Sequence, residues 1–316
     1  MTVSLVFALA RGALTSPFKR NLDTGAPLPR TRLVRTGVRV DARRLAAYAR
    51  LCGYQETDPL PLPYPHLLGF PLAARVMADR SFPLPMLGLV HTRIEIASHQ
   101  ALRPDDALEL TVFAEELLRR RRGVEVTMTT QARRDGELVW ESRSGYLARR
   151  PTTAAPRTDR DAPPADGDAT PAPRTDRDAT PPASAPAADR DATPDPPANH
   201  HATPAPAARA LPAVAEWRLP ADLGRRYGAA SGDRNPIHLH PLTARLFGFP
   251  RPIAHGMWTL ARCLAEQDGQ IARVRAQFTA PVPLPATVTY AADGAAFQLR
   301  SGDRVHLTGR TSARPS

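Results

Sequence analysis

The middle of the sequence is a long segment that cannot form a core of its own. Between residues 151 and 208 it consists mainly of proline, alanine, aspartate, threonine and arginine, with almost no large apolar side chain. Such a composition buries too little apolar surface to offset the entropy lost on ordering. The segment also repeats itself, since the hexapeptide RTDRDA occupies residues 157–162 and again 174–179. We therefore expect a disordered linker at residues 151–210, with a folded unit on either side.

The segments that flank this linker, residues 1–150 and 211–316, carry similar signals in the same order. Each contains an amphipathic helix that ends at a glycine, Gly53 in the first segment and Gly232 in the second. A second helix, rich in small and apolar residues, follows each of them. These second helices are expected at residues 68–77 and 254–264. The repeated order indicates two diverged copies of one unit.

Strands with alternating polarity follow each apolar helix. They are expected at residues 91–96, 107–113, 123–130 and 138–142, and again at 274–278, 286–290, 296–299 and 305–308. The dipeptides Asp135-Gly136 and Asp293-Gly294 are typical of hairpin turns. Helices followed by an antiparallel meander, twice over, predict an α+β chain in which each half wraps its apolar helix in a curved sheet.

The charge of the chain is strongly positive and comes from arginine. The formal charge is +11 at pH 7, and Lys19 is the only lysine. A cationic surface attracts anionic partners such as the phosphates of coenzyme A or an acidic carrier protein. The arginine bias does not by itself indicate a nucleic-acid groove, so no nucleic-acid partner is expected. The arginine run at residues 119–122 is interpreted as a solvated basic surface without a specific partner.

The sequence gives no indication of membrane insertion, secretion or a metal site. Residues 3–10 are apolar but short, and no basic residue precedes them. No later run approaches the length of a membrane span, so a cytoplasmic location is expected. Cys52 and Cys263 lie in apolar helical patterns without CxxC spacing, which favours neither a disulfide nor a metal site. The pair His200-His201 lies within the linker and is interpreted as incidental.

One segment, residues 227–257, concentrates reactive side chains among glycines and prolines. Asp233 and His238 stand five residues apart in a stretch where Gly232 and Pro236 indicate a fixed, irregular loop. A carboxylate and an imidazole on such a loop can converge on one small ligand, and both transfer protons near neutral pH. Asp233 and His238 are therefore the candidate catalytic pair.

Three blocks of this segment resemble the hydratase-2 signature of the MaoC-like family. They are S-G-D-x-N-P-I-H at residues 231–238, A-x-x-x-G-F at residues 244–249 and P-I-A-H-G-M at residues 252–257. The layout in two halves resembles the double-hotdog members of the family, which include 3-hydroxyacyl-thioester dehydratases. The resemblance implies a degenerate N-terminal hotdog domain in residues 1–150 and a catalytic MaoC-like hotdog domain in residues 211–316.

The resemblance also implies roles for single residues. Asp233 and His238 match the pair that binds and activates the catalytic water, while Asn235 and Ser231 of the same motif support the site. The Gly256 N–H matches an oxyanion-hole donor for the thioester carbonyl. The implied reaction in fatty acid metabolism is reversible syn hydration of a trans-2-enoyl thioester, carried by coenzyme A or a carrier protein, to the (R)-3-hydroxyacyl thioester. It requires no cofactor and no metal.

Other histidines near the motif are expected to be structural. His240 replaces an aspartate found in many relatives and is expected to cap a short helix that begins at Pro241. His255 is expected to form a bond near the start of the apolar helix, and Tyr227 to pack against the loop or orient it. Residues 301–306 repeat S-G-D-R before a histidine but lack Asn-Pro, which favours a hairpin turn without a catalytic role.

The first half does not repeat the candidate pair. Asp58 and His66 do not reproduce the spacing of Asp233 and His238, so one active site per chain is expected. The first half would complete the sheet and give room for the acyl chain, which makes longer chains plausible substrates. Two alternatives remain open, a hotdog thioesterase and a non-catalytic acyl-thioester-binding partner protein. Both a homodimer and a pseudo-dimeric monomer are compatible with the sequence.

Overall fold

The computed structural model describes residues 28–149 and 210–313, apart from residues 87 and 268. Apart from residue 210, the predicted linker at residues 151–210 lies outside the described residues. The apolar residues 3–10 and the pair His200-His201 also lie outside them. The described residues belong to one compact unit in which both halves of the chain take part.

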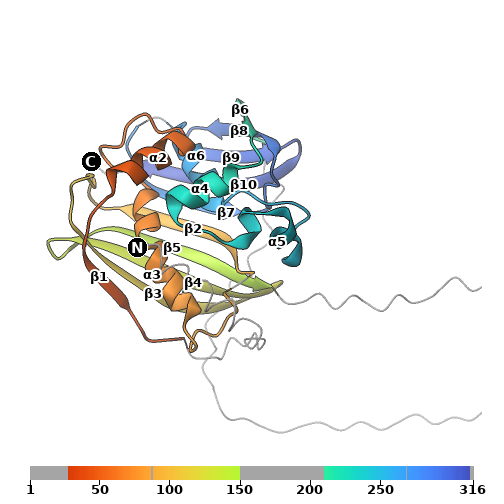
Figure 1. The fold of residues 1–316 in the computed structure, drawn as a ribbon. Helices are drawn as coiled ribbons and strands as arrows, with labels where there is room; N and C mark the ends of the chain where they lie inside the picture. Colours follow the sequence, from red (N-terminus) through yellow and green to blue (C-terminus); the bar gives the residue numbers. More distant parts are fainter. Residues whose placement is uncertain (1–27, 87, 150–209, 268, 314–316) are drawn as a thin grey trace, which may run out of the picture. The chain divides into compact units, whose positions relative to one another are not determined.

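The two halves contain similar elements in a similar order (Figure 1). The first half comprises β1 (Leu33–Val38), α2 (Ala42–Cys52), α3 (Tyr64–Ala78), β2 (Val90–Ser98), β3 (Leu108–Arg120), β4 (Gly123–Arg134) and β5 (Glu137–Arg149). The second comprises β6 (Ala213–Leu219), α4 (Leu223–Ser231), the 3-10 helix η2 (Pro236–His238), α5 (Pro241–Leu246), α6 (Gly256–Leu264), β7 (Ile271–Phe278), β8 (Ala286–Asp293), β9 (Ala296–Ser301) and β10 (Arg304–Ala313). The predicted α+β class is confirmed.

All ten strands form one antiparallel sheet that runs through both halves. Its order is β1-β3-β4-β5-β2-β7-β10-β9-β8-β6, so each half contributes five adjacent strands. The halves meet where β2 pairs with β7, with Arg93 opposite Gln277 and Ile96 opposite Val274. Figure 1 shows the curved sheet behind the helices, with α3 in front of the strands of the first half. The sheet is therefore a single structure, and the join between halves lies at its centre.

The helices begin and end where capping residues allow. In α2 the Asp41 carboxylate accepts a hydrogen bond of 3.1 Å from the N–H of Arg44, and Gly53 ends the helix at a φ of 84°. The apolar helix α3 begins at Tyr64, four residues before the predicted start at residue 68. Pro65 lies in the first turn, where its missing N–H costs no helical bond. Pro65 is thus compatible with the helix start.

Side chains from each half bond to backbone groups of the other. The Trp258 indole in α6 donates a hydrogen bond of 2.8 Å to the carbonyl of Leu51 in α2. In return, the Arg44 guanidinium in α2 donates two hydrogen bonds, of 3.2 and 3.3 Å, to the carbonyl of Ala230 near the end of α4. The helix that leads into the candidate catalytic loop is therefore held from the first half.

The strands differ from the expectations in two ways. β3 and β5 each run for 13 residues, well past the ends predicted for them. The edge strands β1 and β6 were not predicted, and both are largely exposed, which weakens the alternating pattern. Residues 119–122 are exposed, as predicted, although the Arg120 guanidinium also lies 2.8 Å from the Glu125 carboxylate. None of the described helices is long and apolar enough to cross a membrane.

Candidate active site

The loop after α4 is held by a chain of short-range hydrogen bonds. Gly232 ends the helix at a φ of 86°. The Ser231 hydroxyl then accepts a hydrogen bond of 3.1 Å from the N–H of Asp233, and the Asp233 carboxylate accepts one of 3.1 Å from the N–H of Asn235. The Asn235 side chain in turn accepts one of 3.4 Å from the N–H of Ile237. Each bond spans two residues, so the motif itself defines the shape of this loop.

Gly224 lets helix α4 approach the backbone of the candidate catalytic loop. A Cβ atom at this position would lie 2.0 Å from the carbonyl oxygen of His238, closer than any non-bonded contact allows. Helix α4 therefore packs directly against η2, the 3-10 helix that carries His238. The position of His238 thus depends on the absence of a side chain at Gly224.

The hydrogen bond of His238 fixes its tautomer. Its Nδ1 lies 2.7 Å from the carbonyl oxygen of Ile253, which can only accept, so Nδ1 carries the proton. In the neutral ring the lone pair then lies on Nε2. Within the described residues no protein group bonds this second nitrogen, and the side chain lines a cavity between the two halves of the chain. Nε2 is therefore the atom that a ligand or a water molecule can reach.

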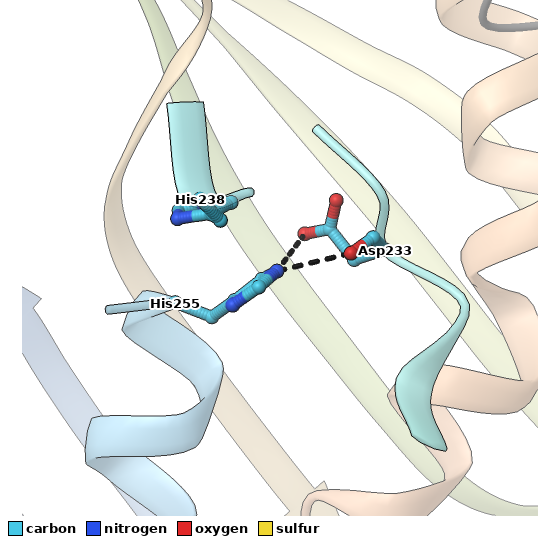
Figure 2. Close-up of side chains that lie close together, drawn as sticks. All are labelled: Asp233, His238 and His255. Carbon is cyan, nitrogen blue, oxygen red and sulfur yellow. Dashed lines mark hydrogen bonds and ion pairs between the residues drawn. The ribbon is translucent and has the colours of Figure 1, made fainter. Parts of the chain in front are cut away.

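His255 bonds the same loop from the start of helix α6. Its Nε2 lies 3.0 Å from the main-chain oxygen of Asp233 and 3.9 Å from the Asp233 carboxylate (Figure 2). Because the main-chain oxygen accepts, Nε2 carries the proton and Nδ1 has the lone pair. Nδ1 is buried and has no partner among the described residues. The predicted structural bond of His255 near the helix start is thus confirmed, with Asp233 as the acceptor.

The electrostatic environment keeps the two histidines neutral. Burial lowers the pKa of His238 below its usual range, and burial together with the neighbouring His238 lowers the pKa of His255 further. Burial raises the pKa of the Asp233 carboxyl, although the nearby His238 opposes that shift. The Asp233 side chain keeps 28 % of its surface exposed because it faces the cavity. A carboxylate and a neutral imidazole therefore share one partly enclosed space.

Three residues of the site could in principle hold a metal ion. The ligand atoms of Asp233, His238 and His255 lie within 4.8 Å of one another. Two observations argue against that use. The two imidazole rings stack with their centroids 3.7 Å apart, whereas ligands of one ion point their lone pairs toward a common centre. The His255 nitrogen nearest Asp233 already donates a hydrogen bond there. The arrangement is that of a hydrogen-bonded acid–base site.

Gly256 is the first residue of α6 and borders the same cavity. The N–H groups in the first turn of a helix have no acceptor within the helix, and the helix dipole favours negative charge there. A Cβ atom at Gly256 would lie 3.1 Å from the ring of Phe278, so the cavity wall fits closely around this backbone. The position suits an oxyanion donor of the predicted kind, but it stays a prediction.

The cavity that contains these residues has a volume of about 240 Å³ and is lined by both halves of the chain. From the first half, His66, His91, Tyr146, Arg122 and Arg149 contribute polar walls. The His91 and Tyr146 rings stack, with their centroids 4.6 Å apart. His91 Nε2 and the Tyr227 hydroxyl are buried without a partner among the described residues. The first half therefore supplies polar groups as well as space, contrary to the expectation.

No local sequence signal marks these first-half residues. Asp58 and His66 lie apart in function, because the Asp58 carboxylate lies 3.4 Å from Arg103 on the surface, whereas His66 lines the cavity. His91 and Tyr146 meet because β2 pairs with β5, with the two residues in register. Their place in the cavity could be predicted only from the register of β2 and β5, which the sequence does not specify.

The predicted helix cap, the packing of Tyr227 and the hairpin turn are confirmed, whereas the absence of a catalytic role for residues 301–306 stays a prediction. His240 caps α5, because its Nδ1 accepts a hydrogen bond of 3.2 Å from the N–H of Leu242. Tyr227 is buried, and its ring lies 4.9 Å from that of His255. Residues 301–306 include the turn between β9 and β10. There, His306 lines the cavity while its Nε2 lies 3.0 Å from the Ser301 hydroxyl.

Sequence comparisons relate the chain to proteins of known family. Residues 202–311 match the family described as the MaoC like domain. The chain is 30% identical to 3-hydroxyacyl-thioester dehydratase X of Mycobacterium tuberculosis over 259 residues, which cover 81% of this chain and 78% of that protein. A stretch of 30 residues, 10% of each chain, is 63% identical to the peroxisomal enoyl-CoA hydratase 2 of Arabidopsis thaliana.

Solved structures agree with the fold. The crystal structure of HtdX from Mycobacterium tuberculosis is similar with a TM-score of 0.66 and 26% identity, over 89% of this chain and 99% of that one. A MaoC-like dehydratase from Phytophthora capsici is similar in fold, with a TM-score of 0.61 and 16% identity over 93% and 98% of the two chains. Together with the two helix-and-sheet halves, these likenesses confirm the α+β double-hotdog prediction. The chain belongs to the MaoC-like dehydratase family.

Proposed function

We propose that the protein catalyses the reversible syn hydration of trans-2-enoyl thioesters to (R)-3-hydroxyacyl thioesters, with Asp233 and His238 as the catalytic pair. The observation that carries the proposal is the convergence of this carboxylate and a neutral imidazole on one cavity. Membership of a dehydratase family supports it. So does the similarity to a relative whose name gives 3-hydroxyacyl thioesters as its substrates.

The protonation states support a role in activating water. Hydration adds the water oxygen to C3 and a proton to C2, while the C2–C3 double bond becomes single. With the His238 Nδ1 proton donated to Ile253, Nε2 is free to accept a hydrogen bond from a water molecule. The Asp233 carboxylate faces the same space and supplies a second acceptor. One bound water can then lose a proton to the pair, and the pair can return it to C2 on the same face.

The start of helix α6 supports stabilisation of the enolate-like transition state. Negative charge develops on the thioester carbonyl oxygen as the water attacks C3. The Gly256 N–H lies at the positive end of the helix dipole, where it can donate to that oxygen. Ser231 and Asn235 contribute indirectly, because their side chains hold the backbone on either side of Asp233. These assignments place the chemistry in the hotdog domain at residues 211–316.

The domain assignment belongs to the same proposal. Residues 1–150 would form the N-terminal hotdog domain without a catalytic pair of its own, and residues 151–210 would connect the two domains. The cavity walls that each half contributes support one shared active site per chain rather than two. Coenzyme A and carrier-protein thioesters are both substrates that this arrangement would accept.

The test is an assay of purified protein with trans-2-enoyl-CoA substrates from crotonyl-CoA to longer chains. Hydration removes the absorbance of the conjugated double bond, and chiral analysis of the product should give the (R)-3-hydroxyacyl thioester. Release of free thiol, measured in parallel, would instead indicate a thioesterase. Absence of hydration over the whole range of chain lengths would rule out the proposal for coenzyme A thioesters.

A further inference from the structure

Two arginines of the first half line the catalytic cavity without an ion-pair partner in the part of the chain that the structure describes. They are Arg122, in the turn between β3 and β4, and Arg149, the last residue of β5. Both side chains are exposed, which places them at the cavity entrance rather than in its interior. Arg122 precedes Gly123, and Gly123 pairs directly with Arg149 across the two strands. The two guanidinium groups therefore belong to the same end of the sheet.

Other arginines in the strands of the first half form ion pairs with carboxylates. Each of the following has a carboxylate partner within 3.0 Å: Arg93 and Arg120 with Glu125, Arg134 with Asp106, and Arg143 with Glu115. Among the described residues that line the cavity, Asp233 is the only carboxylate, and it belongs to the candidate catalytic pair. The two arginines at the entrance thus provide positive charge that no acidic side chain of the cavity neutralises.

Arg149 reaches across to the catalytic half. Its guanidinium carbon lies 5.9 Å from the centre of the Phe249 ring, within the range of a cation–π contact. Phe249 also lines the cavity and belongs to the second block of the family signature. This contact orients one cation over the entrance while leaving its N–H donors free for a ligand. Arginine in such a position suits phosphate oxygens, which it can bind through two parallel hydrogen bonds.

We infer that Arg122 and Arg149 form a phosphate-binding subsite at the cavity entrance, which anchors the phosphate-bearing carrier of a thioester whose acyl end lies at Asp233. The inference rests on the proposed function for the thioester part of the ligand. The phosphate can come from the diphosphate and 3′-phosphate of coenzyme A or from the phosphodiester that joins a pantetheine arm to a carrier protein. Both carriers present the same chemistry to a pair of guanidinium groups.

Binding of saturated thioesters tests the subsite without turnover. Isothermal titration would measure the Kd of butyryl-CoA, butyryl-phosphopantetheine and butyryl-pantetheine, which carry the phosphorylated nucleotide, a single phosphate and no phosphate, respectively. The protein variants are Arg122→Gln/Arg149→Gln and, as a matched control, Arg121→Gln. Arg121 is equally exposed in the same turn but does not line the cavity. The control removes a positive charge from the same turn but not from the subsite.

The double variant should bind butyryl-CoA about tenfold more weakly or worse, the usual scale for lost hydrogen bonds between charged groups. Its affinity for butyryl-pantetheine should stay within about twofold of wild type, as should the affinity of Arg121→Gln for every ligand. A loss shared by butyryl-phosphopantetheine would identify the phosphate of the pantetheine arm. A loss confined to butyryl-CoA would locate the contact at the phosphorylated nucleotide of coenzyme A.

Three results would overturn the inference. They are equal weakening of the phosphate-free ligand, equal weakening by Arg121→Gln, and the absence of any phosphate-dependent affinity in the wild-type protein. Failure of the proposed function would look different. In that case the double variant would lose phosphate-dependent binding as expected, while wild type would bind enoyl thioesters without hydrating them.

Discussion

The imidazole rings of His238 and His255 stack with their centroids 3.7 Å apart, and only one of them has a ring nitrogen open to the cavity. His238 keeps Nε2 available, whereas His255 uses Nε2 to hold the backbone of Asp233. The two rings are therefore not interchangeable. His238 has the open nitrogen that the proposed proton transfer requires, and His255 holds the main chain at Asp233.

Replacement of His255 should separate positioning from catalysis. In His255→Leu the Asp233 carbonyl loses its donor, and the loop that carries the carboxylate loosens. We expect kcat for hydration to fall about tenfold or more, with little change in KM, because small misplacements of a catalytic group are costly. His255→Gln keeps a side-chain donor and should recover part of the rate. An equal loss in both variants would contradict a role that depends on this hydrogen bond.

Gly224→Ala should lower the stability of the protein, although a glycine-to-alanine substitution in a helix usually raises it. Alanine normally stabilises a helix interior by about 1 kcal/mol relative to glycine. Here the added Cβ would lie 2.0 Å from the His238 carbonyl, so α4 and η2 must move apart. We expect both a lower free energy of unfolding in urea and a strong loss of hydration activity. Arg226→Ala, at an exposed position of the same helix, is the control and should change neither by much.

Arg44→Met should weaken the connection between the halves while keeping the length of the side chain. Arg44 donates two hydrogen bonds to the Ala230 carbonyl at the end of α4. Removal of a charged donor from this part-buried carbonyl should lower the free energy of unfolding by about 1 to 2 kcal/mol. The exposed neighbour Arg43 provides the control Arg43→Met. The same urea midpoint for both variants would show that the bond between the halves contributes nothing measurable.

Buried histidines should make the protein sensitive to acid. Burial lowers the pKa of His66 to about 4, and it also lowers the pKa values of His91, His238, His255 and His306. In the unfolded chain these groups take up protons near pH 6.5, so the unfolded state binds more protons below that pH and stability falls. The raised pKa of Asp233 acts in the opposite direction, but for one group only.

His66 offers a direct measurement of this effect. Between about pH 7 and about pH 5 its contribution to stability should fall by about 2 kcal/mol, because its folded pKa lies below both values. The urea midpoint of wild type should therefore drop over this interval, and the drop should be smaller in His66→Gln. An identical drop in the two proteins would contradict the neutral, buried state of His66.

The catalytic loop was predictable because its geometry is local. Ser231, Asp233 and Asn235 each bond a backbone N–H two residues further along the chain, so sequence spacing alone specifies that part of the site. The cap of α5 by His240 was predictable for the same reason. Such short-range contacts leave a readable pattern of polar residues, glycine and proline.

The other wall of the cavity was not predictable, since it depends on contacts far apart in the sequence. His91 meets Tyr146 through strand pairing, and Arg149 meets Phe249 across the two halves. His91, Tyr146 and Arg149 lie outside the family motif and show no characteristic spacing. Strand register follows from the packing of the whole sheet. As a result, the first half lines the cavity with hydrogen-bonding groups, whereas the sequence predicts only space for the acyl chain there.

The most direct test of the central claim compares wild type with Asp233→Asn and His238→Gln in hydration of crotonyl-CoA, alongside the Kd of butyryl-CoA. Both substitutions keep the size of the side chain and remove its proton-transfer group. We predict that each lowers kcat about a hundredfold or more while the Kd changes only slightly. Wild-type rates in either variant, with binding intact, would contradict the assignment of Asp233 and His238 as the catalytic pair.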